Sequence, residues 1–147
     1  MFPELTASFF LLAVTVMVHA LGLSAILTPI RRAALTEARF WPVTRVLVRI
    51  AWSLVVLHLI EIAVWALFYW WQQCLPDLES SFYFSGVTYT TVGYGDLVLP
   101  KGWRLLGAVE GLTGILMCGL STGLFFAVVS SIYSPRIEAF VDRRPPD

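Results

Sequence analysis

Three long apolar segments dominate the pattern of hydrophobic and polar positions along this chain. They cover residues 5–30, 46–71 and 104–133, and polar stretches separate them. At a rise of about 1.5 Å per residue, an α-helix over each segment would cross the roughly 30 Å hydrocarbon core of a bilayer. The pattern therefore predicts an all-α membrane protein with three transmembrane helices.

A shorter stretch, residues 78–90, lies between the second and third segments. Asp77 precedes it and can cap a helix, and Glu79 falls in the first turn, where a negative charge favours the helix dipole. A helix of this length spans about 20 Å and cannot cross the bilayer. Non-helical backbone at membrane depth is tolerated only where protein or a water-filled cavity surrounds it. We therefore predict a buried re-entrant helix, from which the chain returns through residues 91–96.

The composition agrees with a membrane protein and narrows its function. Of the 147 residues, 58% are hydrophobic and 14% are charged, whereas soluble domains are nearer half apolar and a quarter charged. The formal net charge is zero, so no nucleic-acid partner is expected. The two cysteines do not make a disulfide framework or a metal site. The sequence contains no metalloprotease, phosphate-loop or nucleophile-elbow motif and does not indicate an enzyme.

The distribution of arginines predicts the orientation in the membrane. Residues 31–45 form a basic linker, in which Pro42 is expected to break any helix, and residues 134–147 form a short tail with three arginines. Basic residues favour the cytoplasmic side. Segment 72–102 has three acidic residues and one lysine and is placed outside. We predict a multi-pass protein of the plasma or inner membrane, surrounded by lipids, with the N-terminus outside, the C-terminus in the cytoplasm and residues 1–30 retained as a helix.

The heptad TTVGYGD, residues 90–96, joins the re-entrant helix to the third span. Gly93 and Gly95 alternate with residues that carry side chains. Successive residues of a normal strand face opposite sides, but glycine reaches positive φ at little cost. Alternating glycines can therefore turn successive carbonyl groups to one side. Such a column of oxygens can replace the hydration shell of a monovalent cation; the alternative is a glycine-rich turn between two helices.

This heptad resembles the selectivity filter of potassium channels, whose signature is TVGYG. The wider likeness covers residues 46–133. It implies four parts, namely an outer helix at 46–71, a pore helix at 78–90, a filter at 91–96 and an inner helix at 104–133. It also implies a potassium-selective ion channel that conducts K⁺ passively without a cofactor. Because each chain supplies one filter, the resemblance implies a homotetramer, in which three further copies complete the pore.

The same resemblance gives roles to individual filter residues. It implies that K⁺ binds to the backbone carbonyls of Thr91, Val92, Gly93 and Tyr94. Gly95 and Asp96 then form the outer mouth, and Thr90 flanks the filter on the other side.

The third span carries several small residues. Gly114 falls where similar channels have a hinge glycine in the inner helix, and a packing glycine is an equally good interpretation. Two pairs, at 107/111 and 119/123, have the GxxxG spacing that permits close helix contact. Residues at spacings that let them face the cavity are Ile115, Cys118 and Thr122.

Histidine and glutamate side chains interrupt the spans. His19 lies in the first, and His58 and Glu61 lie one turn apart in the second. Ionisable groups inside a span suggest a function, so a hydrogen-bonded structural role and a role in pH sensing or gating both remain open. Glu110, in the third span, is expected to face the pore helix or the Glu61 and His58 pair rather than the water path. Cys74 is expected on the outer side, either cross-linking subunits or as a free thiol.

Two other functions are compatible with these residues. A poorly selective cation channel would be favoured by Asp in place of Tyr94, but the filter keeps its tyrosine. A non-conducting regulatory or scaffold subunit would not need the intact heptad. The first span is additional to a two-span pore domain, and its role is open between a packing collar, a partner site and a modulatory element.

Overall fold

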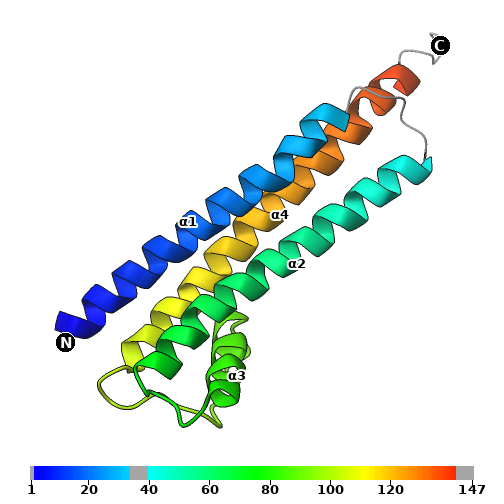
Figure 1. Cartoon of the computed structure of the whole chain (residues 1–147). Coiled ribbons are helices and arrows are strands. Elements are labelled where there is room, and N and C mark those ends of the chain that lie inside the picture. The colour runs from blue at the N-terminus through cyan, green and yellow to red at the C-terminus, as the bar shows by residue number, and fades with distance from the viewer. Residues whose placement is uncertain (1, 34–39, 142–147) are drawn as a thin grey trace.

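The computed structural model describes residues 2–33 and 40–141, and helices account for most of this part of the chain (Figure 1). They are α1 (Phe2–Ala33), α2 (Phe40–Trp71), α3 (Leu78–Tyr89) and α4 (Arg104–Val141). Neither described range contains a strand. The prediction of an all-α protein is confirmed.

Three of these helices are long and apolar enough to cross a membrane. The candidate spans are Glu4–Thr28 in α1, Val43–Trp71 in α2 and Arg104–Ser134 in α4. With 12 residues, α3 is too short to do so. The predicted arrangement of three spans, with a short helix between the second and third, is therefore confirmed.

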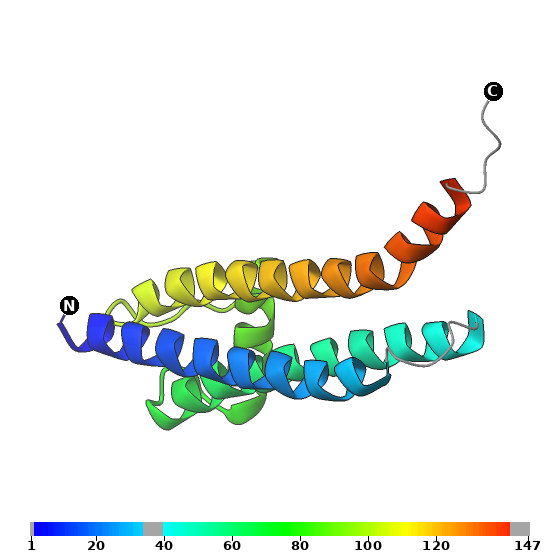
Figure 2. The same cartoon turned by 90° about the horizontal axis from the view of Figure 1, so that it is seen from above.

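The three long helices run alongside one another, and α3 lies between α2 and α4 near one end of the bundle (Figures 1 and 2). α1 packs against α2 and α4 but makes no backbone approach to α3. The N-terminus lies at the end that carries α3 and its loops, and the C-terminus lies at the opposite end (Figure 1). The first helix is thus an addition to the side of the unit formed by α2, α3 and α4.

The structure differs from the sequence-based boundaries around the basic linker. α1 continues to Ala33 and α2 already begins at Phe40, so most of residues 31–45 is helical, and residues 34–39 lie outside the described part. Pro42 was expected to break a helix here, but it lies in the first turn of α2. The amides of a first turn have no intrahelical acceptor, so the missing N–H of proline costs nothing there.

α4 is also longer than expected. It extends to Val141 rather than ending at 133, so half of the predicted tail is helical, and residues 142–147 lie outside the described part. Pro135 falls inside this helix. A proline inside a helix commonly produces a kink rather than an end, and Figure 2 shows α4 bending toward its C-terminal end.

Apolar clusters hold the bundle together at two levels. Near α3, the buried Trp65 and Tyr69 of α2 share a cluster with Leu11 of α1 and Leu106 of α4. Trp65 also donates a 3.0 Å hydrogen bond from Nε1 to Oγ1 of Thr15 in α1. A second cluster, further from α3, is built around Ile50, Leu54 and Val128. These contacts fix the position of α2 and α4, which in turn enclose α3.

Candidate functional site: the end of α3 and residues 90–96

A capping residue fixes the start of α3. Asp77 has an extended backbone, and its carboxylate accepts a 2.7 Å hydrogen bond from the amide of Ser80. Glu79 lies in the first turn. The predicted cap and first-turn charge are confirmed. The helix ends at Tyr89, with Thr90 as its C-cap, so the predicted end at residue 90 was one residue late.

One face of α3 is buried between its neighbours. The ring of Phe84 stacks edge to face on Tyr69 of α2, with ring centroids 5.3 Å apart. The hydroxyl of Ser85 donates a 2.9 Å hydrogen bond to the carbonyl of Ile62, also in α2. On the other side, a Cβ at Gly107 of α4 would lie only 3.5 Å from the Phe84 ring. These contacts determine where α3 ends, and therefore where the heptad begins.

The backbone after α3 alternates in handedness. φ is positive at Thr91 (62°), Gly93 (57°) and Gly95 (78°), and it is negative at the two residues between them. Only glycine adopts positive φ at little cost. Backbone in which right- and left-handed residues alternate gathers its N–H groups on one side and leaves its carbonyl groups on the other. This is the alternation that the two glycines of the heptad were expected to permit.

The hydrogen bonds of residues 91–93 agree with this separation of N–H groups from carbonyl groups. The amide of Thr91 donates to the carbonyl of Thr88 over 2.9 Å, and the amides of Val92 and Gly93 donate to the carbonyl of Val87 over 3.0 and 3.2 Å. Among the described residues, no group donates a hydrogen bond to the carbonyls of residues 91–95. The amides thus anchor the segment to the last turn of α3, and the oxygens remain available for another ligand.

The segment is also uncovered in the single chain. Residues 91–96 are all exposed. The side chain of Val92 is 53% exposed and that of Tyr94 is 72% exposed. A row of unpaired carbonyls with large exposed side chains does not suit a surface in contact with lipid. The surface formed by residues 91–96 therefore needs protein or water around it.

A side-chain hydrogen bond connects the C-terminal end of the heptad to α3. The hydroxyl of Tyr83 donates a 2.7 Å hydrogen bond to Oδ2 of Asp96. This bond raises the pKa of the Tyr83 hydroxyl above its ordinary value, so the hydroxyl stays protonated at neutral pH. Together with the amide bonds near Thr91, it ties both ends of the heptad to α3. The sequence analysis did not foresee this pair, and no pattern in the sequence links positions 83 and 96.

Glu110 lies behind α3 and is completely buried. It accepts a 2.7 Å hydrogen bond from the hydroxyl of Tyr69 in α2, and its other oxygen is hydrogen-bonded to the hydroxyl of Ser85 in α3. It therefore joins α4 to α2 and α3. Of the two neighbours expected for Glu110, the short helix and the pair of Glu61 and His58, it faces the short helix α3.

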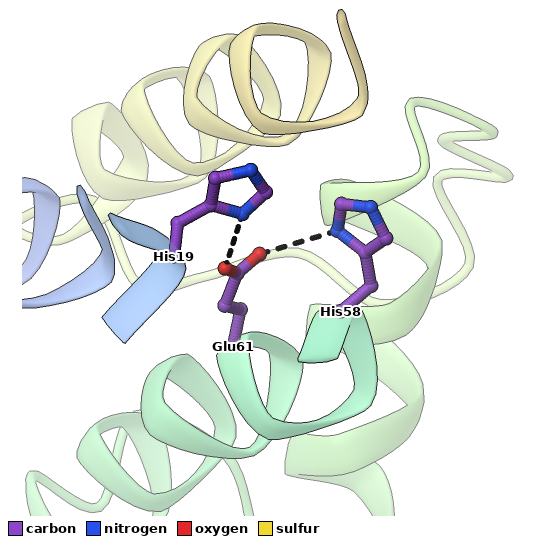
Figure 3. A group of neighbouring side chains, drawn as sticks. All are labelled: His19, His58 and Glu61. Carbon is purple, nitrogen blue, oxygen red and sulfur yellow. Dashed lines mark hydrogen bonds and ion pairs between the residues drawn. The ribbon is translucent and has the colours of Figure 1, made fainter. Parts of the chain in front are cut away.

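A second buried carboxylate, Glu61 of α2, lies at the level of the end of α3. It bonds to Nδ1 of His19 in α1 over 2.7 Å and to Nδ1 of His58 over 3.2 Å (Figure 3). The hydroxyl of Tyr89 also donates to it. The one-turn pairing of His58 with Glu61 was expected, but the link to His19 was missed. The signal that could have found it is a polar residue in each of two adjacent apolar spans.

Gly114 packs directly against the end of α3. A Cβ at this position would lie 2.0 Å from the carbonyl oxygen of Tyr89 and 2.9 Å from its carbonyl carbon. A packing role for this glycine, left open by the sequence, is therefore present in the structure. Of the two GxxxG pairs, residues 107 and 111 approach α3, whereas a Cβ at 119 or 123 would meet nothing within 4 Å.

The other predicted positions on α4 lie on its uncovered surface. Ile115 is 58% exposed, and Cys118 and Thr122 are also exposed. The hydroxyl of Thr122 donates to the carbonyl of Cys118 over 2.8 Å. In the single chain these three residues contact no other helix closely enough to be buried.

Cys74, in the loop before α3, is a free thiol and only 6% exposed. Burial raises the pKa of this thiol, which reduces its thiolate fraction and its reactivity. The two expectations for Cys74, a cross-link between subunits and a free thiol, both stay predictions.

A short helix held between two spans, followed by a row of uncovered carbonyls, is the architecture of a membrane pore domain. A family model for ion channels matches residues 54–131, which is more than half of the chain. The protein therefore belongs to this ion channel family. The matched region begins within α2 and ends within α4, so it includes α3 and residues 90–96, whereas α1 lies outside it. Comparisons with curated proteins and with solved structures give no match.

Proposed function

We propose that the chain is one subunit of a potassium-selective channel, in which residues 91–94 supply the ion-binding oxygens. The observation that carries this proposal is the alternating sign of φ from Thr91 to Gly95, together with the amides of residues 91–93, which bond back to α3. This arrangement leaves a row of carbonyl dipoles that can replace the water around a cation. Membership of the ion channel family supports passive conduction.

Selectivity follows from the balance between dehydration and coordination. Na⁺ is smaller than K⁺ and holds its water more strongly, so a ring of carbonyl oxygens compensates better for the dehydration of K⁺. In this proposal, the carbonyls of Thr91, Val92, Gly93 and Tyr94 line the sites. The Thr91 hydroxyl closes the innermost site, and Gly95 and Asp96 form the outer mouth.

One row of oxygens cannot surround an ion, so four chains are proposed to meet at a common axis. The exposure of residues 91–96 in the single chain supports this, because such a surface needs covering. The exposed Ile115, Cys118 and Thr122 of α4 would then face a shared cavity. The C-terminal ends of four α3 helices would direct their negative dipole ends toward a cation in that cavity.

The proposed orientation places the filter at the outer side of the cell membrane. The N-terminus lies at the same end of the bundle as α3, and the C-terminus lies at the other (Figure 1). Arginines of segments 31–45 and 134–147 then fall in the cytoplasm, as basic residues prefer. The charge distribution and the position of the filter thus give the same orientation.

Reconstitution in liposomes tests the proposal. The purified chain is expected to give K⁺ flux, and bilayer recordings in mixed K⁺ and Na⁺ are expected to reverse near the K⁺ equilibrium potential. In the Gly93→Ala variant, the backbone of an alanine must adopt φ near +57°. This costs about 1–2 kcal/mol per copy, so four copies lose about 4–8 kcal/mol, and flux is expected to fall at least tenfold.

Gly86→Ala is the matched control. Gly86 lies inside α3, has no positive φ, and a Cβ there would meet nothing within 4 Å, so flux is expected to persist. Flux that Gly93→Ala leaves unchanged would contradict a pore lined by residue 93. Equal permeability to K⁺ and Na⁺ would indicate a poorly selective cation channel, and a folded tetramer without any flux would indicate a non-conducting subunit.

A further inference from the structure

The carboxylate of Glu61 lies between the only two histidines of the chain. The ligand atoms that His19, His58 and Glu61 offer all lie within 4.8 Å of one another. Figure 3 shows both imidazole rings turned toward the same carboxylate, His19 from α1 and His58 from the turn before Glu61 in α2. His19 and Glu61 are 1% and 0% exposed. Two imidazole nitrogens and one carboxylate oxygen form the donor set of many zinc sites that keep a fourth position open.

The spacing of the two rings fits coordination of a single ion. Their centroids are 5.7 Å apart. Two imidazoles bound tetrahedrally at metal–nitrogen distances of 2.0–2.1 Å place their centroids about 5 Å apart. A rotamer adjustment of under about 1 Å would therefore bring both Nδ1 atoms into the first coordination sphere. The Oε1 and Oε2 atoms of Glu61 already lie 2.7 and 3.2 Å from these two nitrogens.

A fourth oxygen lies next to the three ligands. The hydroxyl of Tyr89 is 3.0 Å from Nδ1 of His58 and also bonds to Glu61. Nε2 of His19 is buried without any hydrogen-bond partner among the described residues. This nitrogen is not the one that faces Glu61, and an ordered water is a frequent partner of such an atom. The side chain of His58 is 19% exposed, which gives an ion a route of entry.

We propose that His19, His58 and Glu61 form a binding site for a divalent transition-metal ion of the Zn²⁺ class, with the Tyr89 hydroxyl or a water as fourth ligand. α1 does not pack on α3, and Glu61 connects His19 to Tyr89, the last residue of α3. A bound ion would cross-link α1 to the base of the filter. Its charge there would oppose the passage of K⁺; this effect rests on the proposed function, whereas the site itself does not.

Metal binding is measured directly with Co²⁺ added to the purified, tag-free protein in detergent. One ion per chain is expected, with the intense visible absorption of four-coordinate Co²⁺, and Zn²⁺ should abolish this absorption by competition. His19→Gln and His58→Gln are each expected to weaken binding at least tenfold. Glu110→Gln is the matched control, because it changes an equally buried carboxylate that has no histidine beside it, and it should bind Co²⁺ as the unmodified chain does.

The thiols of Cys74 and Cys118 are tested separately, because cysteine thiolates in general also bind these metals. The Cys74→Ser/Cys118→Ser variant is expected to keep the Co²⁺ absorption. If the histidine variants do not fold, X-ray absorption of Zn²⁺ bound to the unmodified chain must show scattering from two imidazoles. Three results would each overturn the metal site and leave a hydrogen-bonded cluster only. They are Co²⁺ absorption equal to that of the hydrated ion, Co²⁺ binding that neither histidine variant affects, and an X-ray absorption spectrum without imidazole scattering.

The effect on conduction has its own readout. Saturating Zn²⁺ is expected to lower K⁺ flux at least twofold in the unmodified channel and not in His19→Gln. Binding without any change in flux overturns the control of conduction. A protein that binds Co²⁺ but conducts no K⁺ refutes the proposed channel function and still supports the metal site, so the two proposals fail separately.

Discussion

Replacing Gly114 by alanine is expected to destabilise the protein by separating α4 from the end of α3. The new Cβ would lie 2.0 Å from the Tyr89 carbonyl oxygen. Carbon and oxygen atoms normally approach to about 3.3 Å, so the two helices would have to move apart by more than about 1 Å. The Cβ is attached rigidly to the backbone of α4, and the nearest atoms of Tyr89 are also backbone. No side-chain rotation can therefore relieve the contact.

The size of the effect can be worked out from opposing contributions. Overpacking a well-packed contact costs about 1–3 kcal/mol, and occasionally more. Alanine inside a helix is more stabilising than glycine by about 0.5–1 kcal/mol. The net loss is therefore expected to be about 0–2.5 kcal/mol, and its middle value of about 1.3 kcal/mol corresponds to a fall of roughly 3–5 °C in melting temperature for a chain of this size. Thermal unfolding in detergent measures the fall, and K⁺ flux should decrease in parallel, because Tyr89 immediately precedes the heptad.

Gly119→Ala is the control in the same helix. A Cβ at 119 meets nothing within 4 Å, so this variant should be at least as stable as the unmodified chain. The experiment also separates the two interpretations of Gly114. A hinge that acts only by bending would leave the melting temperature of Gly114→Ala unchanged or raised and alter gating alone. Equal stability of the two variants would refute the close contact between α4 and Tyr89.

Two further predictions concern the ends of α3 and the heptad. Asp77→Ala removes the acceptor for the Ser80 amide, so unfolding in detergent should show a loss of about 1 kcal/mol, whereas Asp77→Asn, which keeps a capping oxygen, should retain most of the stability. Tyr83→Phe removes the bond to Asp96 and is expected to lower the K⁺/Na⁺ permeability ratio. Because the pKa of Tyr83 is raised, the contribution of this bond is complete below the ordinary tyrosine pKa near 10 and is lost as the pH rises through the higher folded value. Selectivity should therefore fall only at strongly alkaline pH, and Tyr83→Phe should abolish that alkaline fall; an unchanged fall in the variant would contradict the assignment.

The helices and the heptad could be predicted because their signals are local. Each span is a continuous apolar segment, the Asp77 cap lies one residue before α3, and the glycines at 93 and 95 permit the positive φ found there. Thr91 shows the limit of this reasoning. It has positive φ without being a glycine, and only its hydrogen bond to the end of α3 indicates why that conformation is held.

The contacts between distant segments could not be predicted from sequence patterns. His19 and Glu61 are 42 positions apart, and their meeting depends on the alignment of α1 along α2. That alignment is set by shape, since Gly22 of α1 admits the side chain of Leu57, to which a Cβ would approach within 2.4 Å. Pro42 was misjudged for a different reason, since the effect of a proline depends on its distance from the helix start, and the start of α2 was placed too late.

The uncovered carbonyls of residues 91–95 have a consequence for biogenesis. In the proposed pore, a single newly inserted chain would expose these groups at membrane depth, where each unsatisfied polar group costs several kcal/mol. An orphan subunit should therefore be short-lived in the bilayer and a target for membrane proteases. Cellular abundance would then rise steeply, rather than in proportion, with the rate of synthesis.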